Sequence, residues 1–580
     1  MAKKDPPTPI QSKWAFRVVA AGIFLAEIAV LPGASSPFRL SKEAVVLIAI
    51  CLALGLAAAS AARRGSFNFP TSRLALVLLA LPALLAVSAS WSASPLRALE
   101  SAALTAMWVA GMLWLSTLGP GPRRQLVLAA SLGVVVSATV MTIQLAGISV
   151  FNFTTPFASK RLSLTGLTGN PADLAMAAVL LLPLLLAGAN TRKWKPLELA
   201  LVIILVFATL LSRTLTGIAA LAAVLAIWLI QQKSRKLWVA AAAVGAVLLT
   251  AALVTGLGSR LEKTSKSLRE GNYYALLSAR ADGWTAAEEM VRSRPFAGVG
   301  AANFTYLYYP SRVAWFSRNG GVGQRNELAS HFEWAHCDPL QMVAELGLPG
   351  ILWMTAFLAV VVGARKRAGP IVLLAAAAVT PFALLHYPTH LAVGLIPISL
   401  IIADIIATSD DPRTFGWRAA RAPIALFLVI VAIAGSIWQL RRVAADLWVG
   451  GQELRLRFAE GSAPDVRVRQ AAIVEAQILP RIGRLPAAAP ILWRTVGRAR
   501  ILRNDYQAAE SAFRSSYALW PHEDAEFYLG MTLVAQGRRS EGLALLGRVC
   551  RTNPQLVSLI ADEDLKRSVE GMLEAYRGAG

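Results

Sequence analysis

Long apolar runs separated by short polar connectors make up most of this chain. An apolar helix needs roughly 17–25 residues to cross about 30 Å of hydrocarbon. About thirteen runs reach that length: residues 15–31, 44–62, 74–91, 98–117, 125–146, 171–188, 196–212, 214–230, 237–257, 340–362, 370–386, 390–407 and 422–440. The pattern therefore predicts an all-α polytopic membrane protein of about 13 transmembrane helices.

One polar stretch, residues 258–340, interrupts the apolar runs at much greater length than any other connector between spans. A connector of this size is too long to be a simple link. We expect it to fold and to carry chemistry, as functional loops do.

The pattern changes again after residue 440. From Ala445 onward the charge density rises and apolar residues recur at helical spacing, which predicts a soluble domain over residues 445–580, after a transmembrane domain over residues 1–440. Four positions repeat at an offset of 33 residues: Gly497 and Gly530, Ala509 and Gly542, Phe513 and Leu546, and Pro521 and Pro554. This offset resembles the 34-residue tetratricopeptide period. Such a helical-repeat domain could offer a concave surface to a protein partner or cap the membrane bundle.

Composition supports membrane insertion. Hydrophobic residues make up 56% of the chain and charged residues 16%, with a mean hydropathy of +0.54, which excludes a soluble protein of this length. The formal charge of +23 comes from short clusters of Lys and Arg between apolar runs. This placement favours contact with anionic lipid over binding to nucleic acid.

The basic clusters also predict the orientation. They precede the first span and occupy every second connector after it, at Lys3, Lys4, Lys13, Arg63, Arg64, Arg73, Arg123, Arg124, Arg192, Lys193, Lys195, Lys233, Arg235, Lys236, Arg365, Lys366, Arg367, Arg413, Arg418 and Arg421. By the positive-inside rule the N-terminus is cytoplasmic. The 258–340 loop, the smaller 147–170 loop and the C-terminal domain then lie outside the cytoplasm.

Metal and cofactor motifs are not found in the sequence. The outer loops hold no HExxH, no Cys/His cluster and no paired acidic motif, and no P-loop is found, so we expect neither a metal nor a cofactor. The three cysteines, Cys51, Cys337 and Cys550, match no metal or disulfide spacing. A Cys337–Cys550 bridge is one alternative, but unpaired thiols are favoured.

Several ionisable residues are predicted to lie together at the outer membrane face: Arg161, Arg213, Arg280, His336, His386 and His390. An ionisable side chain near hydrocarbon is a functional candidate because its placement is costly. For Arg161 and Arg213 the alternative is an ordinary interfacial side chain with its charge in water. Guanidinium groups bind phosphate oxygens in bidentate fashion, and histidine can accept a proton near neutral pH. Aromatic residues in the loop could stack on sugars or form an interfacial belt.

Three motifs resemble those of a known superfamily. They are Arg280-Ala-Asp-Gly-Trp284, Arg294-Pro-Phe-Ala-Gly-Val-Gly300 and His336 followed, after ten intervening residues, by Gly347-Leu-Pro-Gly350. Together with Gly169-Asn-Pro171 and Ser212-Arg213, they resemble the O-antigen ligase and polysaccharide polymerase superfamily, which includes bacterial protein O-oligosaccharyltransferases. The resemblance is close over residues 160–405.

This resemblance implies a metal-independent, inverting glycosyltransferase that uses an undecaprenyl-diphosphate-linked glycan as donor. Arg213, Arg280 and His336 match positions that the superfamily uses at its active site, and Arg161 is a further candidate for binding the donor diphosphate. His336 would orient or deprotonate the acceptor hydroxyl, and the arginines would stabilise the departing diphosphate. Gly347 and Gly350 are expected to permit close backbone packing.

The acceptor stays open between lipid A core sugar, a growing polymer and Ser or Thr of an exported protein. A function of another class, a lipid-linked sugar transporter or flippase without chemistry, is also considered. Transporters place their ionisable residues near the bilayer midplane, whereas these candidates lie at one face, which favours an enzyme.

Overall fold

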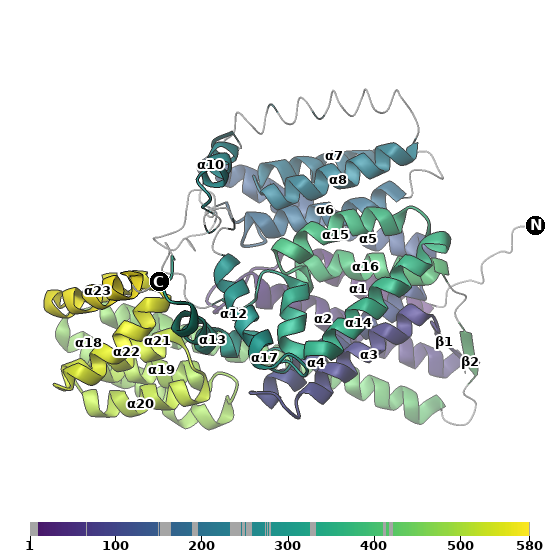
Figure 1. The fold of residues 1–580 in the computed structure, drawn as a ribbon. Helices are drawn as coiled ribbons and strands as arrows, with labels where there is room; N and C mark the ends of the chain where they lie inside the picture. Colours follow the sequence, from purple (N-terminus) through teal and green to yellow (C-terminus); the bar gives the residue numbers. More distant parts are fainter. Residues whose placement is uncertain are drawn as a thin grey trace, which may run out of the picture.

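The structure is a computed structural model of the full chain. It describes residues 10–578 except 65, 149, 151–163, 188–194, 233–244, 246–249, 251–257, 273, 275–276, 278–279, 325–331, 410–412 and 417–420. The described part is almost entirely helical (Figure 1). The helices of the membrane bundle are α1 (Ile10–Ile28), α2 (Arg39–Arg64), α3 (Arg73–Ser88), α4 (Pro95–Ser116), α5 (Pro120–Leu145), α6 (Pro171–Ala187), α7 (Pro196–Leu211), α8 (Leu215–Gln232), α14 (Asp338–Ala368), α15 (Ile371–Leu385), α16 (Ala392–Ser409) and α17 (Arg421–Glu460).

The predicted spans coincide with these helices, with one exception. The span expected at 237–257 lies almost entirely outside the described residues. Within the described part, seven helices are long and apolar enough to cross a membrane, and α3, α6, α7 and α15 are shorter apolar helices. Proline at the first helical position begins α4, α5 and α7, where its missing N–H has no helical partner to lose. The chain is thus an all-α polytopic membrane protein.

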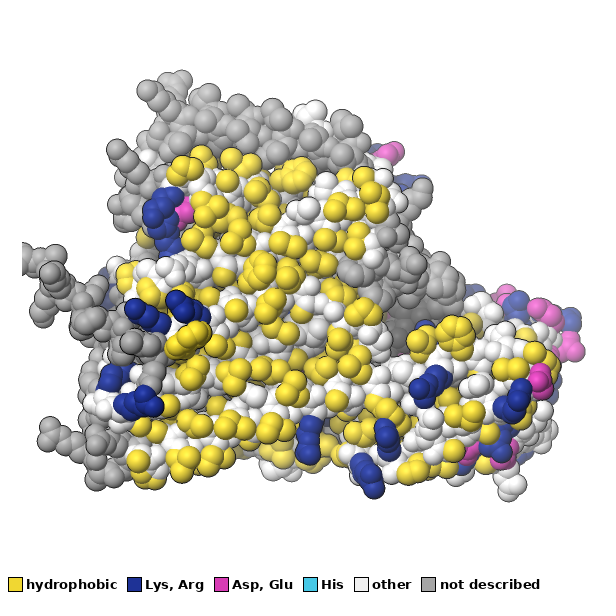
Figure 2. Space-filling model, turned by 180° about the vertical axis from the view of Figure 1, so that it is seen from behind, with side chains coloured by type: hydrophobic (Ala, Val, Ile, Leu, Met, Phe, Trp, Pro, Cys, Tyr) yellow, Lys and Arg dark blue, Asp and Glu magenta, His cyan; other side chains and the backbone are white. Residues whose placement is uncertain are grey.

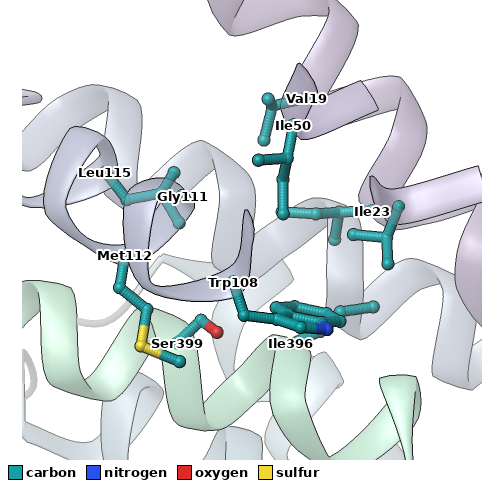
Figure 3. A pocket seen from close by; sticks show the side chains of 10 residues that line it. Val19, Ile23, Ile50, Trp108, Gly111, Met112, Leu115, Ile396 and Ser399 are labelled. Carbon is teal, nitrogen blue, oxygen red and sulfur yellow. The ribbon is translucent and has the colours of Figure 1, made fainter. Parts of the chain in front are cut away.

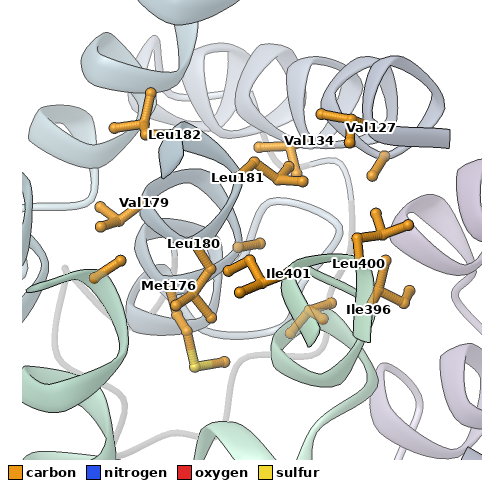
Figure 4. Packing of buried hydrophobic residues seen from close by; sticks show 14 of the residues in the cluster. Val127, Val134, Met176, Val179, Leu180, Leu181, Leu182, Ile396, Leu400 and Ile401 are labelled. Atoms are coloured by element: carbon orange, nitrogen blue, oxygen red, sulfur yellow. The ribbon is translucent and has the colours of Figure 1, made fainter. Parts of the chain in front are cut away.

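Helix α6 forms the centre of the bundle. Nearly every one of its residues is buried, because the helix is apolar on all sides and α5, α7, α15 and α16 surround it. Figure 4 shows Leu180 of α6 lying close to Ile401 of α16 within this core. The outer surface of the bundle is also apolar: hydrophobic side chains cover the broad face in Figure 2, as a lipid-facing surface requires.

An apolar pocket lies between α1, α2, α4 and α16 (Figure 3). Its lining residues are Val19, Ile23, Val46, Ile50, Trp108, Gly111, Met112, Leu115, Ile396 and Ser399. The lining contains no ionisable side chain, so this pocket has no acid–base group to offer a reaction.

The polar 258–340 stretch folds into helices, as expected: α10 (Gly258–Arg269), α12 (Arg280–Ser293) and α13 (Phe304–Asn319). The C-terminal domain contains α18 (Pro464–Ile478), η4 (Leu479–Arg484), α19 (Ala489–Ile501), α20 (Tyr506–Leu519), α21 (Glu523–Ala535), α22 (Arg539–Thr552), η5 (Pro554–Leu559) and α23 (Glu563–Gly578).

The loop helices and the C-terminal domain share one hydrophobic core. Phe304, Tyr308 and Tyr309 of α13 are buried in the same cluster as Leu546 and Val549 of α22. Helix α22 lies beside α13 and contacts it (Figure 1). The two segments therefore lie on the same side of the bundle, which agrees with the even number of spans, α14 to α17, between them.

Helix α17 joins the bundle to the C-terminal domain without a break. Its 40 residues continue through the boundary predicted at 440–445. At this level Arg442 binds Glu43 of α2 and Glu100 of α4. The last turns of α17 then pack against α18 and α19.

The 33-residue repeat has a structural counterpart. A Cβ on Gly497 of α19 would lie 2.6 Å from the ring of Phe513 of α20, and a Cβ on Gly530 of α21 would lie 2.9 Å from Leu546 of α22. In both helix pairs, a small residue on the first helix thus admits a large one from the second. The assignment to the tetratricopeptide class stays a prediction.

A two-stranded ribbon is the one departure from an all-helical chain among the described residues. Strand β1 (Ser66–Phe69) pairs antiparallel with β2 (Arg413–Gly416). The hydrophobic pattern of the sequence does not predict this ribbon. Because both strands lie in connectors with basic clusters, their pairing places those two connectors on the same side, as the charge pattern expects. All three cysteines are free, including Cys337 and Cys550, which confirms the prediction of unpaired thiols.

Candidate active site around His336

His336 lies in an irregular segment between the loop helices and α14. Its backbone adopts a φ of 57°, in the left-handed region that non-glycine residues rarely occupy. Arg213 has the same feature, with a φ of 53° in the turn between α7 and α8. Such strained residues persist only where the surroundings hold them, and they concentrate at functional sites.

The imidazole of His336 is fixed in one tautomer. Its Nδ1 lies 3.1 Å from the carbonyl oxygen of Trp334. Because a carbonyl can only accept, Nδ1 must carry the proton, and in the neutral ring Nε2 is left as an acceptor. The ring of Tyr387 contacts the imidazole edge-on, with 4.7 Å between centroids, and Phe332 lies 5.1 Å away.

The pKa of His336 is lowered from 6.5 to about 3, mainly by burial and also by the nearby His386 and Arg280, which disfavour a further positive charge. His336 is therefore neutral at physiological pH.

Arg280 is the first residue of α12 and reaches the end of α15. Its Nε donates to the carbonyl oxygen of Leu385, at 2.6 Å, and its Nη1 donates to that of Leu277, at 3.0 Å. Leu385 directly precedes His386, so Arg280 lies beside the same turn that contacts His336. The structure thus brings together Arg280 and His336, which are far apart in sequence.

Arg213 lies in the turn between α7 and α8. The helix that follows it, α8, packs closely against α6: a Cβ on Gly217 would lie 2.7 Å from the Cβ of Ala175. Ala175 is two residues from Asp173, the acid that pairs with His386. Arg161, the fourth candidate, lies outside the described residues.

His386 forms a buried pair with an acid. Its Nε2 lies 2.8 Å from Oδ1 of Asp173, in the first turn of α6, and both side chains are almost fully buried. The centroids of the His386 and His336 rings are 6.3 Å apart. Asp173 therefore orients the imidazole of His386, which lies next to the imidazole of His336.

His390 is held by a separate polar network. Its Nδ1 lies 3.1 Å from Asp338, and its Nε2 lies 3.2 Å from Gln341, which also receives the N–H of Ala335. Burial opposes protonation of His390, but the hydrogen bond and charge of Asp338 and the charge of Glu345 raise its pKa above 6.5. This network fixes the backbone next to His336.

The glycine motifs hold the loop against α14. Gly347 has a φ of 60° and breaks α14, and a Cβ there would lie 2.5 Å from the carbonyl oxygen of Phe296. Gly298, with a φ of 67°, lies against the backbone of Glu345 in the same way. A Cβ on Gly350 would lie 2.8 Å from the oxygen of Met342. The prediction that Gly347 and Gly350 permit close backbone packing is confirmed.

Four residues of this cluster were not predicted as site residues: Arg39, Asp173, Trp334 and Tyr387. Of these, Trp334 was considered only as one of the aromatic residues of the loop. Arg39 donates to Tyr387 and Glu333 and lies over the ring of Trp334. Two signals could have revealed them. Arg39 is a basic residue in a connector that the charge pattern places outside, and Asp173 is an acid in an otherwise apolar span.

No group of three or more His, Cys, Asp or Glu with metal-ligand geometry occurs in the part of the chain that the structure describes. The site instead offers an unprotonated imidazole nitrogen, guanidinium groups and aromatic rings.

Comparison with known families bears on this site directly. Residues 199–355, from α7 into α14, match the model of the O-antigen ligase family. This segment is similar to the O-antigen ligase family. It contains Arg213, Arg280 and His336, the three catalytic candidates. A search of curated proteins found no match. The match to the O-antigen ligase family and the apolar helices together support a multi-pass membrane protein of glycosyltransferase type, and the family implies a lipid-linked glycan donor and a polysaccharide acceptor in general terms.

Proposed function

We propose that this O-antigen ligase family member transfers a glycan from an undecaprenyl-diphosphate carrier to an acceptor hydroxyl, in ligation or polymerisation of a surface polysaccharide on the periplasmic face of the inner membrane. The observation that carries the proposal is the neutral His336, with Nδ1 held by Trp334, beside the guanidinium of Arg280.

In this reaction Nε2 of His336 accepts the proton of the acceptor hydroxyl as its oxygen attacks the anomeric carbon. The bond between that carbon and the diphosphate oxygen breaks, the configuration inverts, and the electron pair leaves with the diphosphate. Arg280, Arg213 and Arg161 would stabilise the charge that develops there, without a metal. Positioned cations of this kind act most strongly in a site that excludes water.

The low pKa of His336 suits this sequence of events. A base whose pKa is lowered to about 3, mainly by burial, is weak before the donor binds. A diphosphate bound at Arg280 adds negative charge nearby, which raises the pKa of His336 toward neutrality. Donor binding would therefore activate the base, and the acceptor is deprotonated only when a donor is in place.

The position of the cluster argues against a transporter. His336, His386 and Arg280 lie where the helices meet the loop, and not halfway along the bundle, where transporters hold their substrates. Glycan acceptors are favoured because the family description refers to O-antigen; protein O-oligosaccharyltransfer stays the alternative.

The test uses the purified chain in vesicles with an undecaprenyl-diphosphate-linked oligosaccharide. We expect His336→Ala to lower transfer at least about 10²-fold, in the range of lost acid–base catalysis, while donor binding is kept. Retained transfer in this variant would remove His336 from its role. Comparing lipopolysaccharide, capsule and exported glycoproteins in a deletion strain then selects the acceptor.

A further inference from the structure

Arg39, the first residue of α2, connects three separate parts of the site. Its Nη2 donates to the hydroxyl of Tyr387 at 2.8 Å, and its Nη1 donates to Oε2 of Glu333 at 2.8 Å. The guanidinium carbon also lies 4.6 Å from the centre of the Trp334 ring. Arg39 thus links α2, the segment that leads to His336, and the turn after α15.

We propose that Arg39 is a positioning residue for His336, acting through Trp334 and Tyr387. This inference rests on the proposed function, because it assigns Arg39 a part in the same reaction.

The two residues that Arg39 holds are the two that orient the imidazole. Trp334 supplies the carbonyl that accepts from Nδ1, and Tyr387 supplies the ring that contacts the imidazole edge-on. Trp334 and Tyr387 also stack on each other, with 4.8 Å between centroids and 24° between planes. One guanidinium therefore fixes both the tautomer of His336 and the plane of its ring.

The side chain type fits this task. An arginine presents a rigid planar fork, so it can donate to Tyr387 and Glu333 at once and still lie flat on an indole. A lysine has one compact charge and cannot hold this geometry. Because two of its nitrogens are already engaged by Tyr387 and Glu333, Arg39 is better placed to hold the His336 segment than to bind a donor.

The kinetic test compares Arg39→Lys, Arg39→Gln and Tyr387→Phe with the wild type. The matched control is Arg17→Gln, which removes an arginine lying 5.2 Å from the ring of Trp14 in α1, outside the site. We expect Arg39→Lys and Arg39→Gln to lower kcat about 10–100-fold, with KM for the donor changed less than about twofold, because misplaced catalytic groups cost rate. Tyr387→Phe should lose less, since its ring remains, and Arg17→Gln should match the wild type.

A second measurement does not depend on activity. The chain has only five histidines, so ¹⁵N spectra of histidine-labelled protein can be assigned with His336→Gln. We expect one Nδ1-protonated tautomer for His336 in the wild type and a mixture of tautomers in Arg39→Gln.

The outcomes are distinguishable. A raised KM with unchanged kcat would make Arg39 a donor ligand and overturn the proposal, as would an unchanged tautomer in Arg39→Gln. If the wild type transfers no glycan, the proposed function fails, while the spectra still decide whether Arg39 positions His336.

Discussion

The ion pair between Arg312 and Asp282 gives the sharpest test of how the loop helices hold Arg280. Arg312 lies on α13, and Asp282 is two residues after Arg280 on α12. Nη2 of Arg312 is 2.6 Å from Oδ1 of Asp282, and each side chain is only 3% exposed. Removing one partner of such a buried pair costs about 3–5 kcal/mol, because the other charge stays buried without compensation.

We therefore predict that Arg312→Met lowers the stability of the outer part of the protein by about 3–5 kcal/mol. For a cooperative unit of about 150–250 residues, 1 kcal/mol corresponds to about 2–4 °C in Tm, so the shift should be at least about 6 °C. Tryptophan fluorescence during thermal unfolding in detergent measures it. KM for the donor should rise as well, because the helix that carries Arg280 loses its support.

The double variant Arg312→Met with Asp282→Asn is the control. It removes both charges and keeps an acceptor for the hydroxyl of Tyr274, which lies 3.1 Å from Asp282. We expect the double variant to be more stable than Arg312→Met alone by about 1–3 kcal/mol, as coupled neighbours show. The reasoning is refuted if Arg312→Met costs less than about 1 kcal/mol, or if the second substitution only adds to the loss.

Three further predictions concern the site. The pKa of His336 is about 3 in the folded protein and 6.5 in an unfolded chain, so the unfolded chain binds more protons between these values. Denaturant titrations from pH 6 to pH 4 should show wild-type stability falling relative to His336→Gln by up to about 1.4 kcal/mol per pH unit; parallel curves would contradict this burial. Arg280→Lys should lower kcat/KM at least about tenfold although the charge is kept, because an ammonium cannot reproduce the guanidinium fork; unchanged kinetics would exclude a bidentate contact with the diphosphate. Gly347→Ala should destabilise the protein by more than about 1 kcal/mol in thermal unfolding, since a Cβ at a φ of 60° would lie 2.5 Å from the oxygen of Phe296, whereas Gly363→Ala on the same helix meets nothing within 4 Å and should be neutral or stabilising.

The membrane architecture could be predicted from the sequence because a span is a local property. Hydrocarbon selects apolar runs of a fixed length, so each described helix of the bundle could be predicted from its own residues. The C-terminal helices followed equally from the spacing of their apolar residues. The β1–β2 ribbon could not be predicted, since its strands are four residues each and lie in connectors that are far apart in the sequence.

The site could be predicted only in part. Arg280 and His336 carry a family motif, which made them candidates without any knowledge of their contacts. Arg39 carries no motif, and its partner Glu333 is 294 residues away, so only the folded chain reveals their pairing. The break in α14 at Gly347 likewise depends on the docking of Phe296, a tertiary contact that no local pattern encodes.

The shared core of α13 and α22 affects how the C-terminal domain can be studied. A fragment beginning near Ala445 would start inside the unbroken helix α17 and would leave the face around Leu546 and Val549 without the aromatic rings of α13 that cover it. A pull-down with that fragment would enrich proteins attracted to a surface that the intact molecule hides. Screens for binding partners should therefore use the whole chain in detergent or nanodiscs as bait.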